Sequence, residues 1–351
     1  MIRIIESSQV GTLLARKQSR FEKAEQIVKP ILDDVRKRGD KALLEYARKF
    51  DSFDRKSPLV PKAELDAARA TLSPEFRSAV STAAANVAAF AKLQLPAENV
   101  QNLAPGHKVG QLVRPLDTVA AYIPAGRYPY PSTVIMTAVP ARAAGVPDVC
   151  VTTPRASTEI LGVCSMLEVN RVFLLGGAHA IAAFAYGTKT VPRADRIVGP
   201  GNIYVAAAKK LLAGEVGIDF IAGPTEILII AAEGNPAWIA ADMLAQAEHD
   251  TDASAILLTT SKRLAAGVAR EIEQQLKSLS TAAVARKAID RNSAIVVVRK
   301  LDEAVTLCNL FAPEHLSIPD ESLLPGIRNA GSIFIGAMSP EAAGDSASGP
   351  N

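Results

Sequence analysis

The sequence has few aromatic residues and almost no excess of charge, and both shortages exclude a class of protein. Aromatic side chains make up 5% of the 351 residues, and 39 Lys and Arg stand against 36 Asp and Glu. The formal charge is therefore only +3, and no run of five or six basic residues occurs. Such a chain has little to neutralise phosphates or to stack on bases, so we do not expect it to bind nucleic acid.

Cysteine and long apolar stretches are also scarce. Cys150, Cys164 and Cys308 show no CxxC spacing, and an odd number suits a disulfide framework poorly, which favours a reducing compartment. No apolar run reaches the roughly 18 residues that a bilayer span needs. We therefore predict a cytoplasmic protein without membrane contact. The length allows about two domains, each with a core of its own.

The apolar pattern changes along the chain. Residues 18 to about 95 have helical spacing with expected breaks at Pro30, Gly39-Asp40 and Pro61. From residue 119 onward, short β-branched runs alternate with Ala-rich helical segments, which is typical of parallel α/β sheets. The expected strands are 119–123, 149–153, 171–175 and 196–198, followed after residue 224 by 227–231, 255–260, 295–298 and 332–335. We predict an α/β fold with two lobes and an N-terminal helical arm.

Three turns of the first lobe join an expected strand to a helix: Pro124-Ala125-Gly126, Gly176-Gly177 and Gly199-Pro200-Gly201. Glycine at such a turn lets the backbone approach a pyrophosphate, and the helix that follows offers unpaired NH groups. None of the turns matches GxGxxG, so each alone also fits a simple tight turn; three together favour a nucleotide. Asp195 has a ribose-binding spacing, but a surface ion pair explains it better.

Two pairs of residues suggest chemistry in the second lobe. Asn235-Pro236 begins a helix that we expect to reach His249, and Gln246 and His249 then share one face, as metal ligands do. A histidine at a helix C-terminus beside a solvated glutamine fits equally. Glu314 and His315 lie where a helix ends and a strand begins, and suit acid-base chemistry with two opposite partners. A surface glutamate beside a packing histidine is the alternative.

Six stretches, taken in order, resemble the histidinol dehydrogenase family from about residue 20 to Asn351. They are YIPAGRYPYPS at 122–132, GGAHAI at 176–181, VGPGNIY at 198–204, AGPTE at 222–226, QAEH at 246–249 and APEHL at 312–316. The resemblance implies two lobes with incomplete Rossmann-like parallel sheets. It assigns 1–115 to a helical arm packing on the second lobe, 116–224 to an NAD-binding lobe, and 225–351 to a lobe with the metal and catalytic residues.

The resemblance also implies an activity, the oxidation of L-histidinol to L-histidine through L-histidinal with two NAD⁺. By resemblance, the zinc ligands are Gln246, His249 and Asp345, and the catalytic residues are Glu314, which activates water, and His315, which moves protons. The NAD contacts are Tyr122, His179 and Asn202. The substrate contacts are Thr225, Gln246, His249, His315 and Asp345. Zinc suits the oxygen and nitrogen ligands and anchors the amino alcohol without carrying electrons.

This sequence departs from the family pattern at several positions. Ala125, His179, Thr225 and Ser346 replace the usual glycine, glutamine, serine and tyrosine. The chain stops at Asn351, where relatives continue with a histidine ligand and a helical module that reaches the partner subunit, so we expect a truncated chain and a homodimer in the full-length form. Two alternatives stay open: a superfamily dehydrogenase of another polar alcohol, such as a sulfonated diol, and a non-catalytic remnant that binds NAD or zinc.

Overall fold

The computed structural model describes residues 1–14, 21–125, 129–221, 223 and 225–344, which form two compact units. The six-stranded unit combines Met1–Ser19 with Gly223–Gly344, and the five-stranded unit runs from Arg20 to Ala222. The boundary between the units thus lies close to the expected one at residue 224. Residues 1–14 form part of the six-stranded unit and not of a helical arm, which differs from the expected domain ranges.

A parallel sheet with the order β6-β5-β4-β7-β8 forms the centre of the five-stranded unit. Its strands are β4 (Thr118–Tyr122), β5 (Asp148–Thr153), β6 (Arg171–Leu174), β7 (Arg196–Val198) and β8 (Gly217–Ile218). The chain first adds strands on one side of β4 and then returns to add β7 and β8 on the other. The crevice beside such a reversal point, here between β4 and β7, is where open α/β sheets bind ligands.

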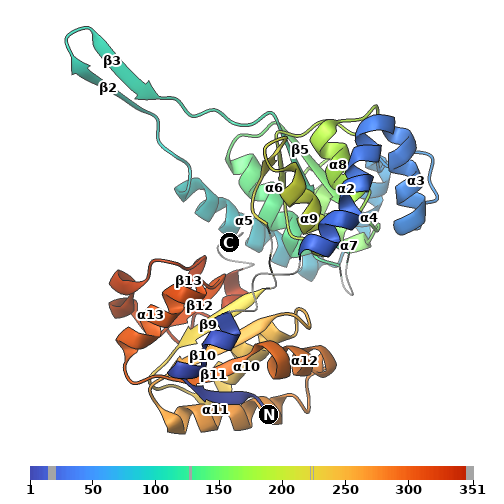
Figure 1. The fold of residues 1–351 in the computed structure, drawn as a ribbon. Helices are drawn as coiled ribbons and strands as arrows, with labels where there is room; N and C mark the ends of the chain where they lie inside the picture. Colours follow the sequence, from blue (N-terminus) through green and yellow to red (C-terminus); the bar gives the residue numbers. More distant parts are fainter. Residues whose placement is uncertain (15–20, 126–128, 222, 224, 345–351) are drawn as a thin grey trace. The chain divides into compact units, whose positions relative to one another are not determined.

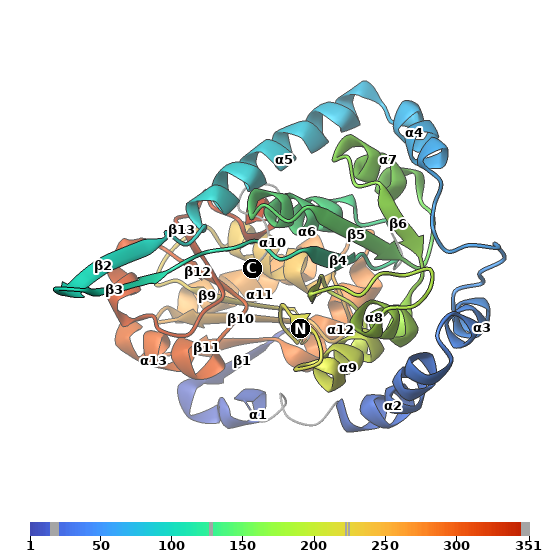
Figure 2. The same ribbon diagram turned by 90° about the horizontal axis from the view of Figure 1, so that it is seen from above.

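Helices cover both faces of this sheet (Figures 1 and 2). One layer joins α4 (Lys62–Thr71) and α5 (Pro74–Leu93) to α6 (Pro131–Ala143) and α7 (Thr158–Met166), and the other joins α2 (Phe21–Arg38) and α3 (Asp40–Phe50) to α8 (Gly177–Tyr186) and α9 (Ile203–Leu212). The helical arm therefore packs within the first lobe, whereas the resemblance had implied packing on the second lobe. Its apolar stripe, including Val28, Leu32 and Val35, is buried in the core of the five-stranded unit.

Pro30 lies inside helix α2 and does not break it, contrary to the expectation from sequence. A proline removes one helical hydrogen bond and crowds the preceding turn. The helix continues on both sides of Pro30 because Val28 and Leu32 are buried, with 0% and 3% exposure. Tertiary packing here outweighs the local cost of the proline.

A hairpin of β2 (Asn99–Ala104) and β3 (His107–Gln111) projects from the five-stranded unit, as Figure 1 shows. The sequence analysis did not predict it. Every residue of both strands is exposed, including Val100, Leu103 and Val109. A two-stranded hairpin is barely stable alone in water, so its apolar side chains are of interest for assembly.

The six-stranded unit has a second all-parallel sheet, in the order β1-β11-β10-β9-β12-β13. Its strands are β1 (Arg3–Glu6), β9 (Glu226–Ile230), β10 (Ser254–Thr259), β11 (Ala294–Val297), β12 (His315–Ile318) and β13 (Ser332–Ile335), and its helices are α1 (Gly11–Leu14), α10 (Pro236–Ala247), α11 (Lys262–Gln275), α12 (Ala282–Asn292) and α13 (Leu301–Phe311). Successive residues of β9 face opposite cores: Ile227 packs with the α10–α12 layer, and Leu228 with α13. Burial on both faces explains the unbroken apolar runs.

The two sheets share one topology. In each, the first and fourth strands of the series pair at the centre, β4 with β7 and β9 with β12. Only β1, which was not predicted, has no counterpart, since it adds to the edge beside β11. In the described ranges, every helix is too short or too polar to cross a bilayer.

Candidate functional site

The first cluster of predicted residues lies at the carboxyl end of β4 in the five-stranded unit. Tyr122, the last residue of β4, is 3% exposed, and its hydroxyl accepts a hydrogen bond from the NH of Gly177 at 3.1 Å. Burial raises the pKa of this phenol to about 12. The hydroxyl therefore stays protonated at neutral pH and joins the end of β4 to the first residue of α8.

His179 on α8 is buried beside a residue that the sequence analysis missed. Its side chain is 1% exposed, and its Nε2 lies 2.9 Å from Oδ2 of Asp51, just after α3. The same Asp51 oxygen accepts the NH of Gly176 at 2.8 Å. The rings of Tyr46 and Phe50 lie 6.2 Å from the imidazole, centroid to centroid. No local pattern singles out Asp51, because 125 residues separate it from Gly176.

The Gly199 turn after β7 is held by a buried ion pair. Asp219 accepts the Gly199 NH at 2.7 Å, while the Lys209 ammonium donates to the Gly199 carbonyl at 2.9 Å and pairs with Asp219. Burial lowers the pKa of Lys209. Gly199 has φ +102°, and an added Cβ would lie 2.3 Å from the Tyr122 carbonyl oxygen, so only glycine fits. The two central strands thus meet closely at this edge.

These contacts change how the glycine turns are interpreted. The NH groups of Gly176, Gly177 and Gly199 already have acceptors in Asp51, Tyr122 and Asp219. Asn202 caps α9, because its side-chain oxygen accepts hydrogen bonds from the Tyr204 and Val205 NH groups at 3.0 and 3.1 Å. A phosphate at this edge would therefore bind other donors than the three glycine amides. Gly126 of the first turn lies outside the described residues.

The second cluster lies at the amino ends of β9 and β12 in the six-stranded unit. The Thr225 hydroxyl donates to Oε2 of Glu314 at 2.7 Å, and the Glu226 NH donates to the same oxygen at 3.2 Å. His315 is buried, and its Nδ1 lies 3.2 Å from the Glu226 carbonyl oxygen. Glu314 precedes β12 in a bend, so strand alternation does not apply, and both side chains turn toward the start of β9 and not to opposite sides as predicted.

Gln246 on α10 extends this network. Its Nε2 donates to the Thr225 hydroxyl at 2.7 Å, which gives a chain of hydrogen bonds from Gln246 through Thr225 to Glu314. The side chain is 0% exposed, so the interpretation as a solvated glutamine is wrong. Its Oε1 is buried and has no hydrogen-bond partner among the residues that the structure describes. A buried amide oxygen left unpaired is costly, unless a ligand such as a metal ion completes it.

Asn235 caps α10 as predicted, accepting the Ala237 NH at 2.9 Å, but the helix ends at Ala247, earlier than expected. His249 lies in the following turn with an exposed side chain, and its NH donates to the Gln246 carbonyl at 3.3 Å. The two expected ligands are therefore neighbours across a turn rather than on one helix. Asp345, the third expected ligand, lies outside the described residues.

A second carboxylate lies near His315. Oε1 of Glu341 and Oε2 of Glu314 are each 3.8 Å from Nδ1 of His315, and the Glu341 side chain is 8% exposed. Glu341 begins the short 3-10 helix η4 (Glu341–Ala343), which packs against α10. Glu341 was not predicted from sequence, because no local pattern around it indicates burial.

The donor set fits a metal only in part. The described ranges contain no group of three His, Cys, Asp or Glu that could hold an ion. The expected ligands Gln246, His249 and Asp345 do not form such a group, because Gln246 is not one of these residue types and Asp345 lies outside the described residues. The orphaned Oε1 of Gln246 is the observation that favours a metal here.

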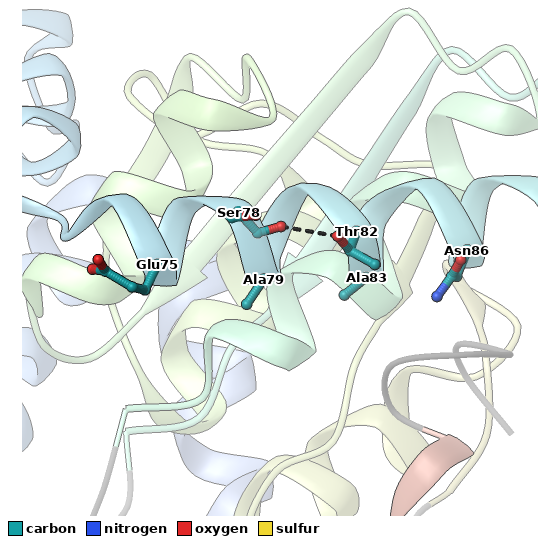
Figure 3. A pocket seen from close by; sticks show the side chains of 6 residues that line it. All are labelled: Glu75, Ser78, Ala79, Thr82, Ala83 and Asn86. Atoms are coloured by element: carbon teal, nitrogen blue, oxygen red, sulfur yellow. Dashed lines mark hydrogen bonds between the residues drawn. The ribbon is translucent and has the colours of Figure 1, made fainter.

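Two pockets of the five-stranded unit contain none of the predicted site residues. One runs along a face of α5 and is lined by Glu75, Ser78, Ala79, Thr82, Ala83 and Asn86 (Figure 3). The other lies at the amino ends of β4, β7 and β8, where Asp195 accepts the NH groups of Asp117 and Thr118 at 3.0 and 2.9 Å. Asp195 thus anchors the start of β4, as Glu314 anchors the start of β9. Neither role considered for Asp195 from sequence, a ribose contact or a surface ion pair, includes this contact.

Comparison with known proteins decides the family. The histidinol dehydrogenase family model matches residues 14–351. The chain belongs to the histidinol dehydrogenase family. The histidinol dehydrogenases of Geobacter metallireducens and Geobacter sulfurreducens are each 47% identical to it, over 97% and 98% of this chain and 81% and 83% of their own lengths. The crystal structure of histidinol dehydrogenase from Elizabethkingia anophelis matches with a TM-score of 0.93 at 35% identity, covering all of this chain and 84% of that one.

Membership in the histidinol dehydrogenase family confirms the predicted fold class, two lobes of parallel α/β sheet. It makes the protein an oxidoreductase of a family that acts in histidine biosynthesis. Neither a dehydrogenase of sulfonated diols nor a non-catalytic remnant is favoured by the relatives.

Proposed function

We propose that this protein oxidises L-histidinol to L-histidine through L-histidinal, with the reduction of two NAD⁺. One observation carries the proposal: the hydrogen-bonded chain from Gln246 through Thr225 to Glu314, with His315 beside it, in a member of this family. It combines a candidate metal ligand, a hydroxyl, a carboxylate and an imidazole in one polar cluster. Such groups can accept the protons that are released when an alcohol, and then an aldehyde hydrate, is oxidised.

Zinc would be held by Gln246, His249 and Asp345. Because Nε2 of Gln246 donates to Thr225, its Oε1 is oriented as the free ligand atom. When bound, the ion would fix and polarise the amino alcohol as a Lewis acid. Thr225, Gln246, His249, His315 and Asp345 together would contact the substrate.

His315 is suited to accept the alcohol proton. Its Nδ1 faces the Glu226 carbonyl, which can only accept a hydrogen bond, so Nδ1 carries the hydrogen and Nε2 holds the lone pair. In the first oxidation the hydroxyl proton would pass to Nε2 of His315, and bound NAD⁺ would supply the acceptor for the hydride of the carbinol carbon. The product of this step is the aldehyde.

Glu314 is suited to the second oxidation, which needs water. Two donors hold its Oε2, while its side chain keeps 37% exposure, so the carboxylate is fixed and still reaches solvent. As a general base it would take a proton from the water that attacks the aldehyde, while the aldehyde oxygen takes up a proton to give the hydrate. The hydrate is then oxidised by loss of a hydride, for which a second NAD⁺ would be the acceptor, and of a hydroxyl proton, which His315 would accept. The carboxylic acid results.

NAD⁺ would bind at the carboxyl edge of the five-stranded sheet, where Tyr122, His179 and Asn202 surround the β4/β7 reversal point. The topology of the sheet supports this position. Since the three glycine amides are engaged, side chains and the remaining amides would hold the cofactor.

We further propose a homodimer and a cytoplasmic location. The hairpin supports the dimer, because Val100, Leu103 and Val109 are 48%, 68% and 48% exposed on two strands whose residues are all exposed. The cysteines support the location, since all three are free and buried.

A substrate panel tests the choice of alcohol. Zinc-loaded protein should form NADH with L-histidinol and with L-histidinal, and far less with sulfonated diols or simple amino alcohols. A preference for a sulfonated diol would instead favour the superfamily alternative.

A further inference from the structure

Asp51 lies outside every motif of the sequence, yet it connects the elements that surround the proposed cofactor edge. The residue follows α3, is 8% exposed in its side chain, and accepts two hydrogen bonds on one oxygen, Oδ2. One donor is the Gly176 NH, at the N-cap of α8, and the other is His179, in the first turn of the same helix. The carboxylate therefore fixes the start of α8 at two points.

The next amide along the chain transmits this constraint to β4. Gly177 follows Gly176, and its NH donates to the Tyr122 hydroxyl at 3.1 Å. Gly177 has φ +56°, a left-handed conformation that needs support from its surroundings. Asp51, Gly176, Gly177 and Tyr122 thus form one continuous series of contacts, in which the position of the phenol depends on the turn.

The same geometry limits what His179 can do. Nε2 is occupied by Asp51, an added Cβ on Gly177 would lie 3.4 Å from Nδ1, and the side chain is 1% exposed between Tyr46 and Phe50. An imidazole enclosed in this way reaches a ligand poorly. It is placed to stabilise Asp51 instead.

We propose that Asp51, paired with His179, is a positioning residue for the cofactor site, which holds the first turn of α8 and through it the hydroxyl of Tyr122. The proposal rests on the proposed function, since it assumes that NAD⁺ binds at this edge. Asp51 itself touches no reacting atom. Its loss should weaken NAD⁺ binding and leave the amino-alcohol chemistry of the six-stranded unit intact.

The test compares two substitutions at one position. Asp51→Ala removes the oxygen that accepts both hydrogen bonds, and we expect the Kd and KM for NAD⁺ to rise about 10-fold or more, with kcat and the KM for L-histidinol little changed. Asp51→Asn keeps an oxygen that can accept a hydrogen bond from the Gly176 NH, so this variant should retain most of the affinity for NAD⁺. Asp54→Asn, an exposed aspartate of the same loop, is the matched control and should bind like the parent.

Coupling separates positioning from a general loss of stability. If Asp51 acts through Tyr122, the double variant Asp51→Ala, Tyr122→Phe should bind NAD⁺ no worse than the weaker of the two single variants. Calorimetric titration of the zinc-loaded chain with NAD⁺ gives each Kd, and thermal unfolding checks that the variants are folded. Parent-like NAD⁺ binding by Asp51→Ala, or additive losses in the double variant, would overturn the positioning role alone. A parent protein that binds no NAD⁺ would overturn the cofactor site itself.

Discussion

The hydroxyl of Thr225 and the carboxylate of Glu314 lie 2.7 Å apart, although 89 residues separate them. The contact joins the start of β9 to the start of β12, the two central strands of the six-stranded sheet. It places the proposed base at the amino edge of the sheet, opposite to the edge where α/β folds usually bind ligands. The five-stranded sheet repeats this arrangement with Asp195 and Thr118, without a histidine at the next position.

Replacing Glu314 with glutamine should stop the second oxidation. The amide keeps an oxygen for the Thr225 and Glu226 donors but cannot take a proton from water, so we expect the rate of acid formation from L-histidinal to fall about 10²- to 10⁴-fold. Zinc content should be unchanged. Stopped-flow NADH formation from L-histidinal gives the rate, and Glu321→Gln, an exposed glutamate of a 3-10 turn, is the control. Normal acid formation by Glu314→Gln would refute its role as the base.

Replacing His249 with asparagine should reduce zinc binding. Loss of an outer-shell partner alone typically weakens metal affinity about 10- to 100-fold, and loss of a ligand should cost at least as much. Elemental analysis after dialysis against a chelator measures the retained zinc. His107→Asn, an exposed histidine on the hairpin, should retain zinc like the parent, and equal retention by His249→Asn would exclude His249 as a ligand.

Replacing Lys209 with methionine should destabilise the five-stranded unit. Lys209 is 1% exposed, and its loss leaves Asp219 without its charged partner, which we expect to cost about 3 kcal/mol in the free energy of unfolding. The adjacent Lys210 pairs with Glu25 at the surface, so Lys210→Met should cost under about 1 kcal/mol. Urea unfolding compares the two. Equal effects would show that the buried pair does not support the Gly199 turn.

The pair of Glu273 on α11 and Arg286 on α12 should make stability depend on acid pH. Two hydrogen bonds of 2.7 Å from Arg286 lower the pKa of Glu273 from 4.5 to about 2. A depressed folded-state pKa contributes stability above pH 4.5 that is lost as the pH falls toward 2. Because the pair is partly exposed, Glu273→Gln should lower the free energy of unfolding by only about 1 kcal/mol at pH 7, and by less as the pH falls. Urea unfolding of the parent and the variant at several pH values measures this difference. A cost that grows toward low pH would contradict this.

How far the sequence predicts the structure depends on the range of the contacts. The eight strands expected from their apolar runs and the Asn235 cap follow from local sequence patterns and capping chemistry, and the structure confirms them, whereas β1 and β8 were not predicted. Pro30 was misjudged because burial of neighbouring side chains, and not the proline, decides the course of α2. The hairpin was missed because its strands bury nothing in their own unit.

The site shows the same division. Gln246, Glu314 and His315 belong to short motifs and lie together in the structure. Asp51 and Glu341 carry no motif, and only tertiary contacts with His179 and His315 bring them to the two clusters. The end of α10 at Ala247 and the start of β12 at His315 matter too, because they set the directions of the His249 and Glu314 side chains.

The most direct test of the central claim is the stoichiometry of NADH formation from L-histidinol. Zinc-loaded protein with limiting L-histidinol and excess NAD⁺ should form two NADH for each substrate molecule, with L-histidine as the product by chromatography. Absence of NADH, or NADH without L-histidine, would contradict the proposed function.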